Sequence, residues 1–225
     1  MAKAPIAIAI DGPASSGKGT VARLVAGALG YSYVDTGAMY RCVGLLGQRR
    51  GLEPSDGPGL AAMIAKLRFQ ISWRDGRLQV VVDGEDLSTA IRTESVGQLA
   101  SAVATLPEVR AALLELQRSL GAAGGVVMDG RDIGTVILPN AALKVFLDAS
   151  AEVRAQRRQL ELAQRGVAVS AAQVLQELQA RDAQDANRAT APLRAADDAV
   201  HVDSSVLTPQ EVADQVVALA HQRGA

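Results

Sequence analysis

A loop rich in Gly, Ala and Ser surrounds one lysine in the stretch IAIDGPASSGKGTVARLV, residues 8–25. Its glycines let the backbone turn back and present successive N–H groups to an anion. The helix that follows adds the positive end of its dipole at the same place, and the lysine can bridge the outer phosphates of a triphosphate. The pattern predicts a site for the phosphates of a nucleoside triphosphate, formed by Gly12, Pro13, Ala14, Ser15, Ser16, Gly17, Lys18, Gly19 and Thr20.

The residue after the lysine separates this loop from the usual phosphate loop. The usual pattern ends Gly-Lys-Ser/Thr, and its hydroxyl coordinates magnesium directly. Here Gly19 takes that position and the hydroxyl arrives one residue later at Thr20, where it is better placed to bond a phosphate oxygen. This favours small kinases that take magnesium in with the nucleotide, largely through water. It disfavours GTPase switches, which also need a guanine-reading motif such as Asn-Lys-x-Asp that the sequence lacks.

Charged residues follow two later strand-like runs. YVDTGAMYR places Arg41 on the first turns of a helix, and VVMDGRDIGTV places Arg131 and Asp132 on a loop. Ligands bind outside the carboxyl ends of strands in open parallel sheets, so these side chains are expected to face a crevice. Asp129 stands where an acidic residue holds magnesium or its waters in phosphate-loop enzymes, so we expect contact with the metal through water. A plain surface ion pair between Arg131 and Asp132 is the alternative.

The last third of the chain carries two helical patterns with arginines. The stretch from Arg154 to Arg158 gathers three arginines on about one turn of helix, and a hinged arginine lid would neutralise a migrating phosphoryl group and exclude water. Arg181, Asp185 and Arg188 recur at intervals of four and three, which predicts one helical face that pairs with a sugar hydroxyl and an anion. Solvated, ion-paired helix surfaces are the alternative in both places.

Short apolar runs must position these residues at one edge of a sheet. Each run is continuous and bounded by Gly, Asp or Pro, as expected for strands buried on both faces. The runs are Ile6–Ile10, Tyr31–Val34, Val126–Met128, Leu143–Leu147 and Ala199–Val202. Helical patterns alternate with them, so the order predicts an α/β fold, a three-layer α/β/α arrangement of the phosphate-loop NTPase type with a five-stranded parallel sheet.

Local signals predict where several helices begin and end. One helix is expected to stop at Gly30, another to begin at Pro107, and a third to be capped by Ser55 or Asp56.

One segment interrupts the alternation of strands and helices. Residues 68–88, RFQISWRDGRLQVVVDGEDLS, alternate apolar and polar residues around Asp75-Gly76, which is a strong hairpin signal. We expect a small antiparallel sheet here, between the second and third strands of the core, with Trp73 packed in it.

Composition excludes several classes of function. The 225 residues suffice for one α/β domain with an insertion or for two small domains, and 48% apolar with 21% charged residues is typical of a soluble globular protein. A net charge of -1 argues against sequence-independent nucleic-acid binding. Without an apolar run of about 18 residues, no membrane span is expected. The single cysteine, Cys42, cannot form an internal disulfide, which favours a cytoplasmic location.

An ordered set of motifs across essentially the whole chain resembles the bacterial cytidylate kinases, of the nucleoside monophosphate kinase group. The motifs are IDGPASSGKGT, DTGAMYR, the hairpin insert, IRTESV…AS, VMDGRDIGTVILP, KVFLDAS and ARDAQDANRATAPL. The resemblance implies phosphorylation of CMP and dCMP with ATP and Mg2+ by a monomer. It also implies one kinase domain, residues 1–225, with a core (about 1–60, 103–150 and 170–225), a monophosphate-binding insert (about 61–102) and a short lid (about 151–169).

The resemblance further implies roles for single residues. Nine are expected to bind the acceptor nucleotide: Thr36, Arg110 and Asp132 its base, Ser101, Arg181 and Asp185 its pentose, and Arg41, Arg131 and Arg188 its phosphate. Those expected to act on the phosphoryl group during transfer are Lys18, Arg131, Arg188, Arg157 and Arg158. The family often has serine where Thr36 stands, so the preference between CMP and UMP stays open.

Three alternatives to a CMP kinase remain at this point. A nucleoside monophosphate kinase acting on UMP or AMP would share the fold. A metabolite kinase such as shikimate kinase keeps Gly-Lys-Ser/Thr and lacks the hairpin insert, so Gly19 and residues 68–88 count against it. A non-catalytic nucleotide sensor would bind without turnover, and the full set of candidate cations counts against that.

Overall fold

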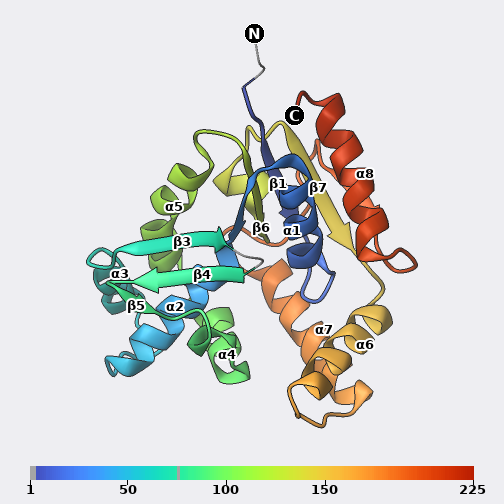
Figure 1. The fold of residues 1–225 in the computed structure, drawn as a ribbon. Helices are drawn as coiled ribbons and strands as arrows, with labels where there is room; N and C mark the ends of the chain where they lie inside the picture. The colour runs from blue at the N-terminus through green and yellow to red at the C-terminus, as the bar shows by residue number, and fades with distance from the viewer. Residues whose placement is uncertain (1–3, 75–76) are drawn as a thin grey trace.

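A five-stranded parallel sheet forms the centre of the computed structural model, which describes residues 4–74 and 77–225 (Figure 1). Its strand order is β2-β6-β1-β7-β8. The strands are β1 (Ala7–Asp11), β2 (Ser32–Asp35), β6 (Val126–Gly130), β7 (Leu143–Asp148) and β8 (Val200–Asp203). Each boundary falls within two residues of the expected apolar run, so the predicted parallel sheet is confirmed.

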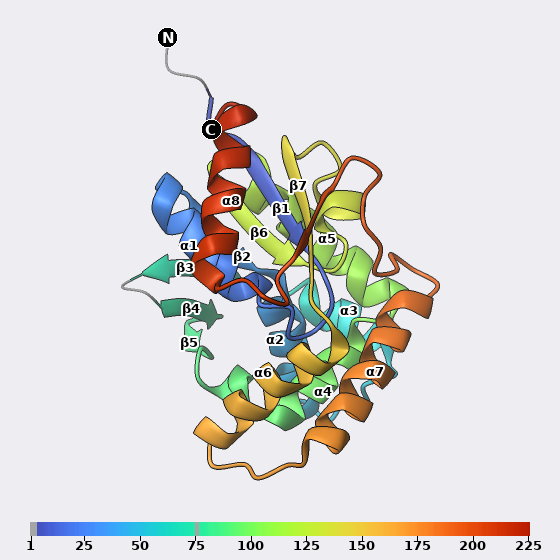
Figure 2. The same ribbon diagram turned by 90° about the vertical axis from the view of Figure 1, so that its right-hand side faces the viewer.

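Helices cover both faces of the sheet, which confirms the predicted three layers (Figures 1 and 2). One face carries α1 (Lys18–Leu29) and α8 (Pro209–Gln222), and the other carries α2 (Thr36–Arg49) and α5 (Pro107–Gly121). Strand residues alternate between the two layers, because Ile8 packs with α1 and α8 whereas Ala9 packs with α2 and α5. The carboxyl ends of the strands therefore share one open edge, where the charged motifs begin.

The predicted helix boundaries are also confirmed. Helix α1 ends with Gly30 in the left-handed conformation at φ 67°, which favours glycine. Helix α5 begins at Pro107, whose missing N–H costs nothing in the first turn. Asp56 caps α3 (Gly57–Ile64), because its Oδ1 accepts from the Gly59 N–H at 2.9 Å.

The insert between β2 and β6 contains the predicted small antiparallel sheet. Its elements are β3 (Phe69–Arg74), β4 (Arg77–Val82), β5 (Glu85–Asp86), the 3-10 turn η1 (Ala90–Arg92) and α4 (Glu94–Val103). The turn expected at Asp75-Gly76 and the packing expected for Trp73 lie outside the described residues. Leu78, Val80 and Val82 are buried in the cluster that holds α2 and α5, so the small sheet shares the hydrophobic core of the large one.

The segment expected to form the lid, residues 151–169, contains α6 (Ala151–Gln164) and the turn into α7 (Ala171–Asn187). The two helices pack through a separate apolar cluster to which the phosphate loop contributes Ala14. Of the helices in the described ranges, none has the length and apolarity that a bilayer crossing requires.

Helix α4 lies against α2 at Gly44. A Cβ atom on Gly44 would stand 2.8 Å from Cβ of Leu99, closer than real Cβ atoms approach, and 3.2 Å from the Leu99 carbonyl carbon. The absence of a side chain at Gly44 thus brings together the helix that carries Arg41 and the helix that carries Ser101.

Replacing Gly44 with alanine should lower the free energy of unfolding by about 1–3 kcal/mol, because the added methyl group must push α4 away from α2. Urea denaturation measures the change. The matched control is Gly27→Ala in α1, where no atom lies within 4 Å of the new Cβ among the described residues. Gly27→Ala should instead raise stability by about 0.5–1 kcal/mol. A Gly44→Ala protein as stable as the control protein would contradict the close-packing account.

Candidate active site

The glycine-rich loop joins β1 to α1 through backbone conformations that only a few residues tolerate. Gly12 has φ 155°, and a Cβ there would lie 2.0 Å from the carbonyl oxygen of Leu147. Ser15 adopts a left-handed φ of 59°, a strained state that is common at functional sites. Gly17 caps α1 at φ 91°, and no side chain among the described residues caps the first turn. The first N–H groups of α1 are therefore open to an anion.

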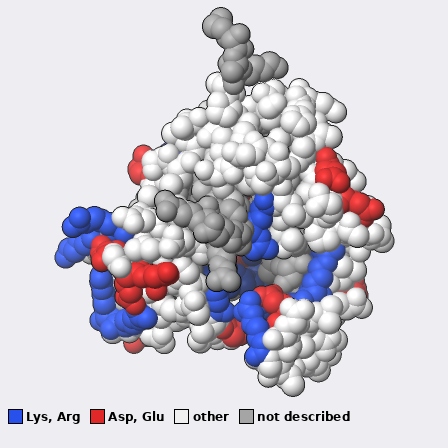
Figure 3. Space-filling view, in the orientation of Figure 1, with Lys and Arg blue, Asp and Glu red and all other residues white. Residues whose placement is uncertain are grey.

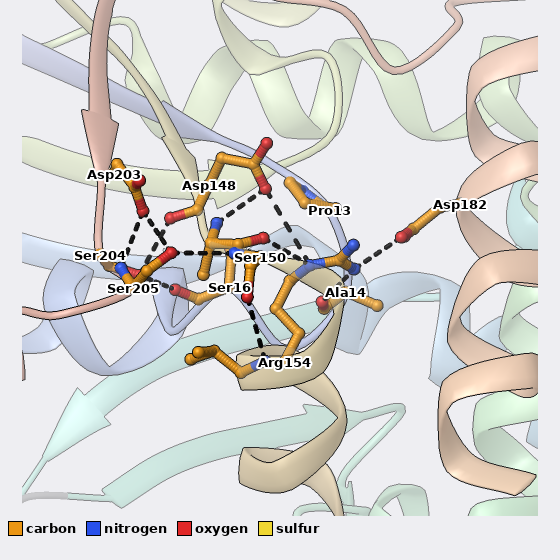
Figure 4. A network of polar contacts seen from close by, with 12 residues as sticks. Pro13, Ala14, Ser16, Asp148, Ser150, Arg154, Asp182, Asp203, Ser204 and Ser205 are labelled. Atoms are coloured by element: carbon orange, nitrogen blue, oxygen red, sulfur yellow. Dashed lines mark hydrogen bonds and ion pairs between the residues drawn. The ribbon is translucent and has the colours of Figure 1, made fainter. Parts of the chain in front are cut away.

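Arginines of α6 hold the loop from outside. The carbonyl oxygen of Ala14 accepts from Arg154 at 3.2 Å, and that of Ser16 accepts from Ser204 at 3.1 Å (Figure 4). The Ser16 oxygen also accepts from Arg157, at 3.3 Å. A peptide group whose oxygen points outward presents the following N–H to the opposite side. These contacts therefore turn N–H groups of the loop inward, as an anion site requires.

Two of the three arginines expected in the lid, Arg154 and Arg157, instead contact this loop and its surroundings. Arg154 is buried and donates to Asp182 of α7 at 2.6 Å, so it lies between the loop and α7 (Figure 4). Arg157 donates to Oγ and O of Ser204, at 2.9 and 2.6 Å. Arg158 alone of the three lines the larger cavity described below.

A cavity of about 410 Å³ opens at the carboxyl edge of the sheet, between the loop, the insert and the α6–α7 pair. Figure 3 shows the hollow in the middle of this face, with Lys and Arg side chains along its walls. The volume is in the range of small-molecule sites. Most of the residues expected from the sequence line it: Ala14, Ser15, Gly17, Lys18, Gly19, Thr20, Thr36, Arg41, Ser101, Arg110, Asp129, Arg131, Asp132, Arg158, Arg181, Asp185 and Arg188.

The remaining expected residues lie elsewhere. Gly12, Pro13, Ser16 and Arg157 are not part of the cavity lining. Ser16 and Arg157 line a second hollow of about 360 Å³ that adjoins the loop on the side of α8. This hollow is mostly apolar, with Leu207, Pro209 and Val212 in its wall, and it shares Ser15, Gly17, Thr20, Arg158 and Glu161 with the larger cavity.

The floor of the larger cavity holds a buried lysine and a buried carboxylate. Lys18 donates to the carbonyl oxygen of Pro13 at 2.8 Å, and burial together with the charge of Arg131 lowers its pKa. Burial raises the pKa of Asp129, and Asp35 on the neighbouring strand raises it further. Tyr33 donates its hydroxyl to Oδ1 of Asp129 at 2.9 Å. Burial and the charge of Asp129 raise the pKa of this phenol, which keeps it protonated.

Asp132 is a buried carboxylate held between two arginines from distant parts of the chain. Arg110 of α5 donates to its Oδ2, and Arg188 donates to its Oδ1 at 3.3 Å. Arg110 also lies over the ring of Tyr40, 5.7 Å from its centroid. The alternative interpretation of the sequence, an exposed ion pair between Arg131 and Asp132, is wrong, because each of the two residues pairs with a distant partner.

Arg131 instead pairs with α7, because its Nε donates to Oδ2 of Asp185 at 2.8 Å. Burial acts to raise the pKa of Asp185, but Arg131, Arg181 and Arg188 together hold it below its usual value. Burial and the charge of Arg131 lower the pKa of Arg181 to about 10. Its buried Nε has no hydrogen-bond partner within the described part of the chain. Helix α7 ends at Asn187, so Arg188 lies just beyond the predicted helical face.

Two residues expected to bind the acceptor nucleotide already have hydrogen-bond partners within the protein. The hydroxyl of Thr36 donates to the carbonyl oxygen of Asp129 at 2.8 Å, which ties the start of α2 to the end of β6. Arg41 donates to the carbonyl oxygens of Ile91 and Thr93, at 3.0 and 3.3 Å, and so holds the insert against α2.

The cavity also contains residues that the sequence did not single out, among them Tyr33, Asp35, Glu94 and Glu161. Tyr33 belongs to a strand and packs in the α1–α8 cluster, so hydropathy alone assigns it to the core. The two glutamates both bond Arg158, from α4 and from within α6. Only the last of these contacts is signalled by sequence, through the i,i+3 spacing of Arg158 and Glu161.

These features define a class of protein, the phosphate-loop kinases: a parallel α/β sheet whose glycine-rich loop, helix N-terminus and lysine face a cation-lined cavity. A gluconokinase structure from Sinorhizobium meliloti 1021 shares the fold, with a TM-score of 0.50 at 16% identity over 99% of this chain and 95% of that one.

The family model for cytidylate kinase matches residues 8–222, and the chain belongs to the cytidylate kinase family. The cytidylate kinase of Saccharophagus degradans is 48% identical over 219 residues, covering 97% of this chain and 98% of that protein. That of Caldicellulosiruptor bescii is 47% identical over 217 residues, covering 96% of each. The family resemblance inferred from the motifs is confirmed, and with it the kinase class of enzyme.

Asp11, the last residue of β1, ties the phosphate loop to the segment that carries Arg131 and Asp132. Its two carboxylate oxygens accept from the N–H groups of Ile133 and Gly134, each at 2.8 Å, at the start of the π-helical turn η2 (Ile133–Ile137). Burial raises the pKa of Asp11 to about 6, although the two hydrogen bonds act in the other direction.

Replacing Asp11 with Asn should change how stability depends on pH. The folded protein holds the Asp11 proton more tightly than the unfolded chain does. The protonated carboxyl therefore stabilises the folded state fully below its ordinary pKa of 3.8. This stabilisation is lost as the pH rises through about 6. Asn has no proton to lose. The stability advantage of wild type over Asp11→Asn should shrink between about pH 4 and pH 8, by roughly 1.4 kcal/mol per unit of pKa shift. Urea denaturation across this range measures it, and a constant difference would contradict the account.

Proposed function

We propose that the protein transfers the γ-phosphoryl group of ATP to CMP and dCMP, giving CDP and dCDP. The observation that carries the proposal is Asp132, a buried carboxylate fixed between Arg110 and Arg188 in the cavity that the phosphate loop faces. Cytosine carries an amino group where uracil carries a carbonyl. A buried carboxylate would accept a hydrogen bond from that amino group, whereas the carbonyl oxygen of uracil would face the carboxylate without a hydrogen to donate and would be repelled by it.

The donor nucleotide is proposed to lie on the loop, with its phosphates on the N–H groups of residues 12–20 and on Lys18. The mostly apolar second hollow, next to Ser16 and Arg157, suits the base of the same nucleotide. Arg157 would then act on transfer through its contact with the donor and the loop, whereas Arg158 would act from within the larger cavity.

Magnesium fits the oxygen groups beside the loop. Asp35 and Asp129 are register partners on β2 and β6, and the mutual repulsion that raises the pKa of Asp129 would be relieved by a divalent cation. Across residues 4–74 and 77–225, no group of three or more His, Cys, Asp or Glu side chains could hold a metal ion. We propose that Mg2+ enters with ATP and contacts Asp129 through water. When bound, it would neutralise charge on the transferred group.

The acceptor is proposed to occupy the part of the cavity between α2, α4 and α7. Thr36, Arg110 and Asp132 would surround the base, and Ser101, Arg181 and Asp185 the pentose. The acceptor phosphate would meet Arg41, Arg131 and Arg188. The unpartnered, buried Nε of Arg181 supports a polar ligand at this place.

Transfer would proceed in line between two nucleotides held in one cavity. An oxygen of the acceptor phosphate forms the new bond to the γ-phosphorus as the bond from that phosphorus to the oxygen of ADP breaks. The acceptor oxygen is already ionised at neutral pH, so no general base is required. Lys18, Arg131, Arg158 and Arg188 would position the phosphates and neutralise their charge.

The proposal extends to the setting of the enzyme. We propose a cytoplasmic monomer in pyrimidine nucleotide metabolism, whose partners are small nucleotides rather than nucleic acid or membrane. The net charge of -1 and the single, buried Cys42 support this.

An acceptor panel tests the proposed reaction directly. ADP release from ATP is measured with CMP, dCMP, UMP, AMP and shikimate at equal concentrations. CMP and dCMP should be phosphorylated faster than the other three. Faster use of AMP would contradict the assignment, and no CMP-dependent ADP release would favour a nucleotide sensor.

Asp132→Asn should lower the preference for CMP over UMP, measured as the ratio of kcat/KM values, by about 10- to 100-fold. The matched control is Asp185→Asn, the same chemical change at another arginine-paired carboxylate of the cavity. Asp185→Asn should reduce activity and alter the ratio of CMP to dCMP while keeping the preference for CMP over UMP. Equal loss of that preference in both variants would remove Asp132 from recognition of the base.

A further inference from the structure

The glycine after the phosphate-loop lysine lies next to a tyrosine hydroxyl. A Cβ atom on Gly19 would stand 3.3 Å from Oη of Tyr33 and 3.9 Å from Oδ2 of Asp129. Gly19 belongs to the first turn of α1, where a serine or threonine of the usual loop would direct its hydroxyl. In this protein, the hydroxyl of Tyr33, on strand β2, borders that space.

Strand pairing fixes the position of the hydroxyl. Tyr33 lies on β2, which pairs in parallel with β6, the strand that carries Asp129. The residue is 4% exposed and packs among residues of α1 and the central strands. The hydroxyl donates to Oδ1 of Asp129 at 2.9 Å, and Oδ2 is the carboxylate oxygen nearer to Gly19. The hydrogen bond therefore directs one oxygen to Tyr33 and the other to the loop.

Asp129 has a second neighbour that could compete for its carboxylate. The charge of Lys18 acts on Asp129 directly, yet its ammonium donates to the Pro13 carbonyl oxygen at 2.8 Å. A neutral hydroxyl on Oδ1 orients the carboxylate without neutralising it, so the negative charge remains for a cation at the loop.

We propose that Tyr33 is a positioning residue for the metal of the donor nucleotide. Its hydroxyl replaces the loop hydroxyl that Gly19 lacks, and it holds Asp129 with Oδ2 toward the loop. The inference rests on the proposed function, because the metal arrives there with ATP.

Tyr33→Phe tests the inference through binding rather than turnover. Isothermal titration calorimetry gives the Kd of ATP with Mg2+ and with EDTA, and the ratio of the two measures the contribution of the metal. Loss of a hydrogen bond to a metal-contacting carboxylate should cut that ratio about tenfold and leave the Kd in EDTA unchanged. Mn2+ binding to the protein–ADP complex, followed by electron paramagnetic resonance, should weaken to the same degree.

Tyr31→Phe is the matched control. It also removes a tyrosine hydroxyl with a hydrogen bond, in this case from the Ile6 N–H at 3.2 Å. Tyr31 is not part of the lining of the larger cavity, so the contribution of the metal should stay at the wild-type value.

A double variant tests the idea of replacement. Tyr33→Phe removes the atom nearest to a Cβ at position 19, so Gly19→Ser in that background should return a hydroxyl to the same space. The contribution of the metal should then rise above that of Tyr33→Phe alone. No recovery would overturn the claim that the two hydroxyls are equivalent.

Other outcomes separate the inference from the proposed function. If wild type phosphorylates CMP and Tyr33→Phe keeps the full contribution of the metal, the inference is wrong and the function stands. If Tyr33→Phe weakens ATP binding equally with Mg2+ and with EDTA, or lowers Tm without changing the ratio, its role is structural and the inference is again wrong. If the contribution of the metal falls as expected but wild type does not phosphorylate CMP, the proposed acceptor is wrong, whereas the proposed ATP site and the inference that rests on it stand.

Discussion

The structure depends on bringing many cations to one edge of a sheet without driving the chain apart. In the described residues this is done by carboxylates from other elements. Asp132 lies between Arg110 and Arg188, Asp185 pairs with Arg131, and Asp182 pairs with Arg154. Each pair joins segments far apart in sequence, so these charges also hold the elements in place.

Such pairs are poor candidates for a purely stabilising role. Taking two charges out of water costs about as much as their attraction returns, and apolar residues of equal size often stabilise a protein more. Asp11 shows the same cost, because burial raises its pKa even though it accepts two backbone hydrogen bonds. The concentration of buried charge around one cavity is therefore better explained by ligand binding than by folding. Asp11 adds rigidity between the loop at one side of the cavity and the segment that begins with Asp132.

The sequence predicts what local patterns control. Strands, the small antiparallel sheet, helix ends at Gly30 and Pro107, and the phosphate loop all follow from hydropathy period, turn residues and caps. The sequence could not show which of the arginines expected in the lid faces the cavity. Arg157 and Arg158 are adjacent on a helix, so their side chains point about 100° apart. Which of them faces the cavity is decided by how α6 packs on α7 and the loop. The pairing of Asp132 with Arg110 is equally non-local, since it joins α5 to the end of β6.

The position after the loop lysine shows how a local departure is resolved by tertiary structure. A hydroxyl carried by the loop takes its orientation from the loop itself, which is held here by strained residues and by outside arginines. A hydroxyl carried by Tyr33 takes its orientation from a packed strand, and its register with β6 places it at Asp129. A Cβ atom at position 19 would stand 3.3 Å from that hydroxyl, so a side chain there would crowd it and glycine leaves it undisturbed. Read alone, Gly19 looks like the loss of a metal ligand, whereas beside Tyr33 it is the space that lets another element supply the hydroxyl.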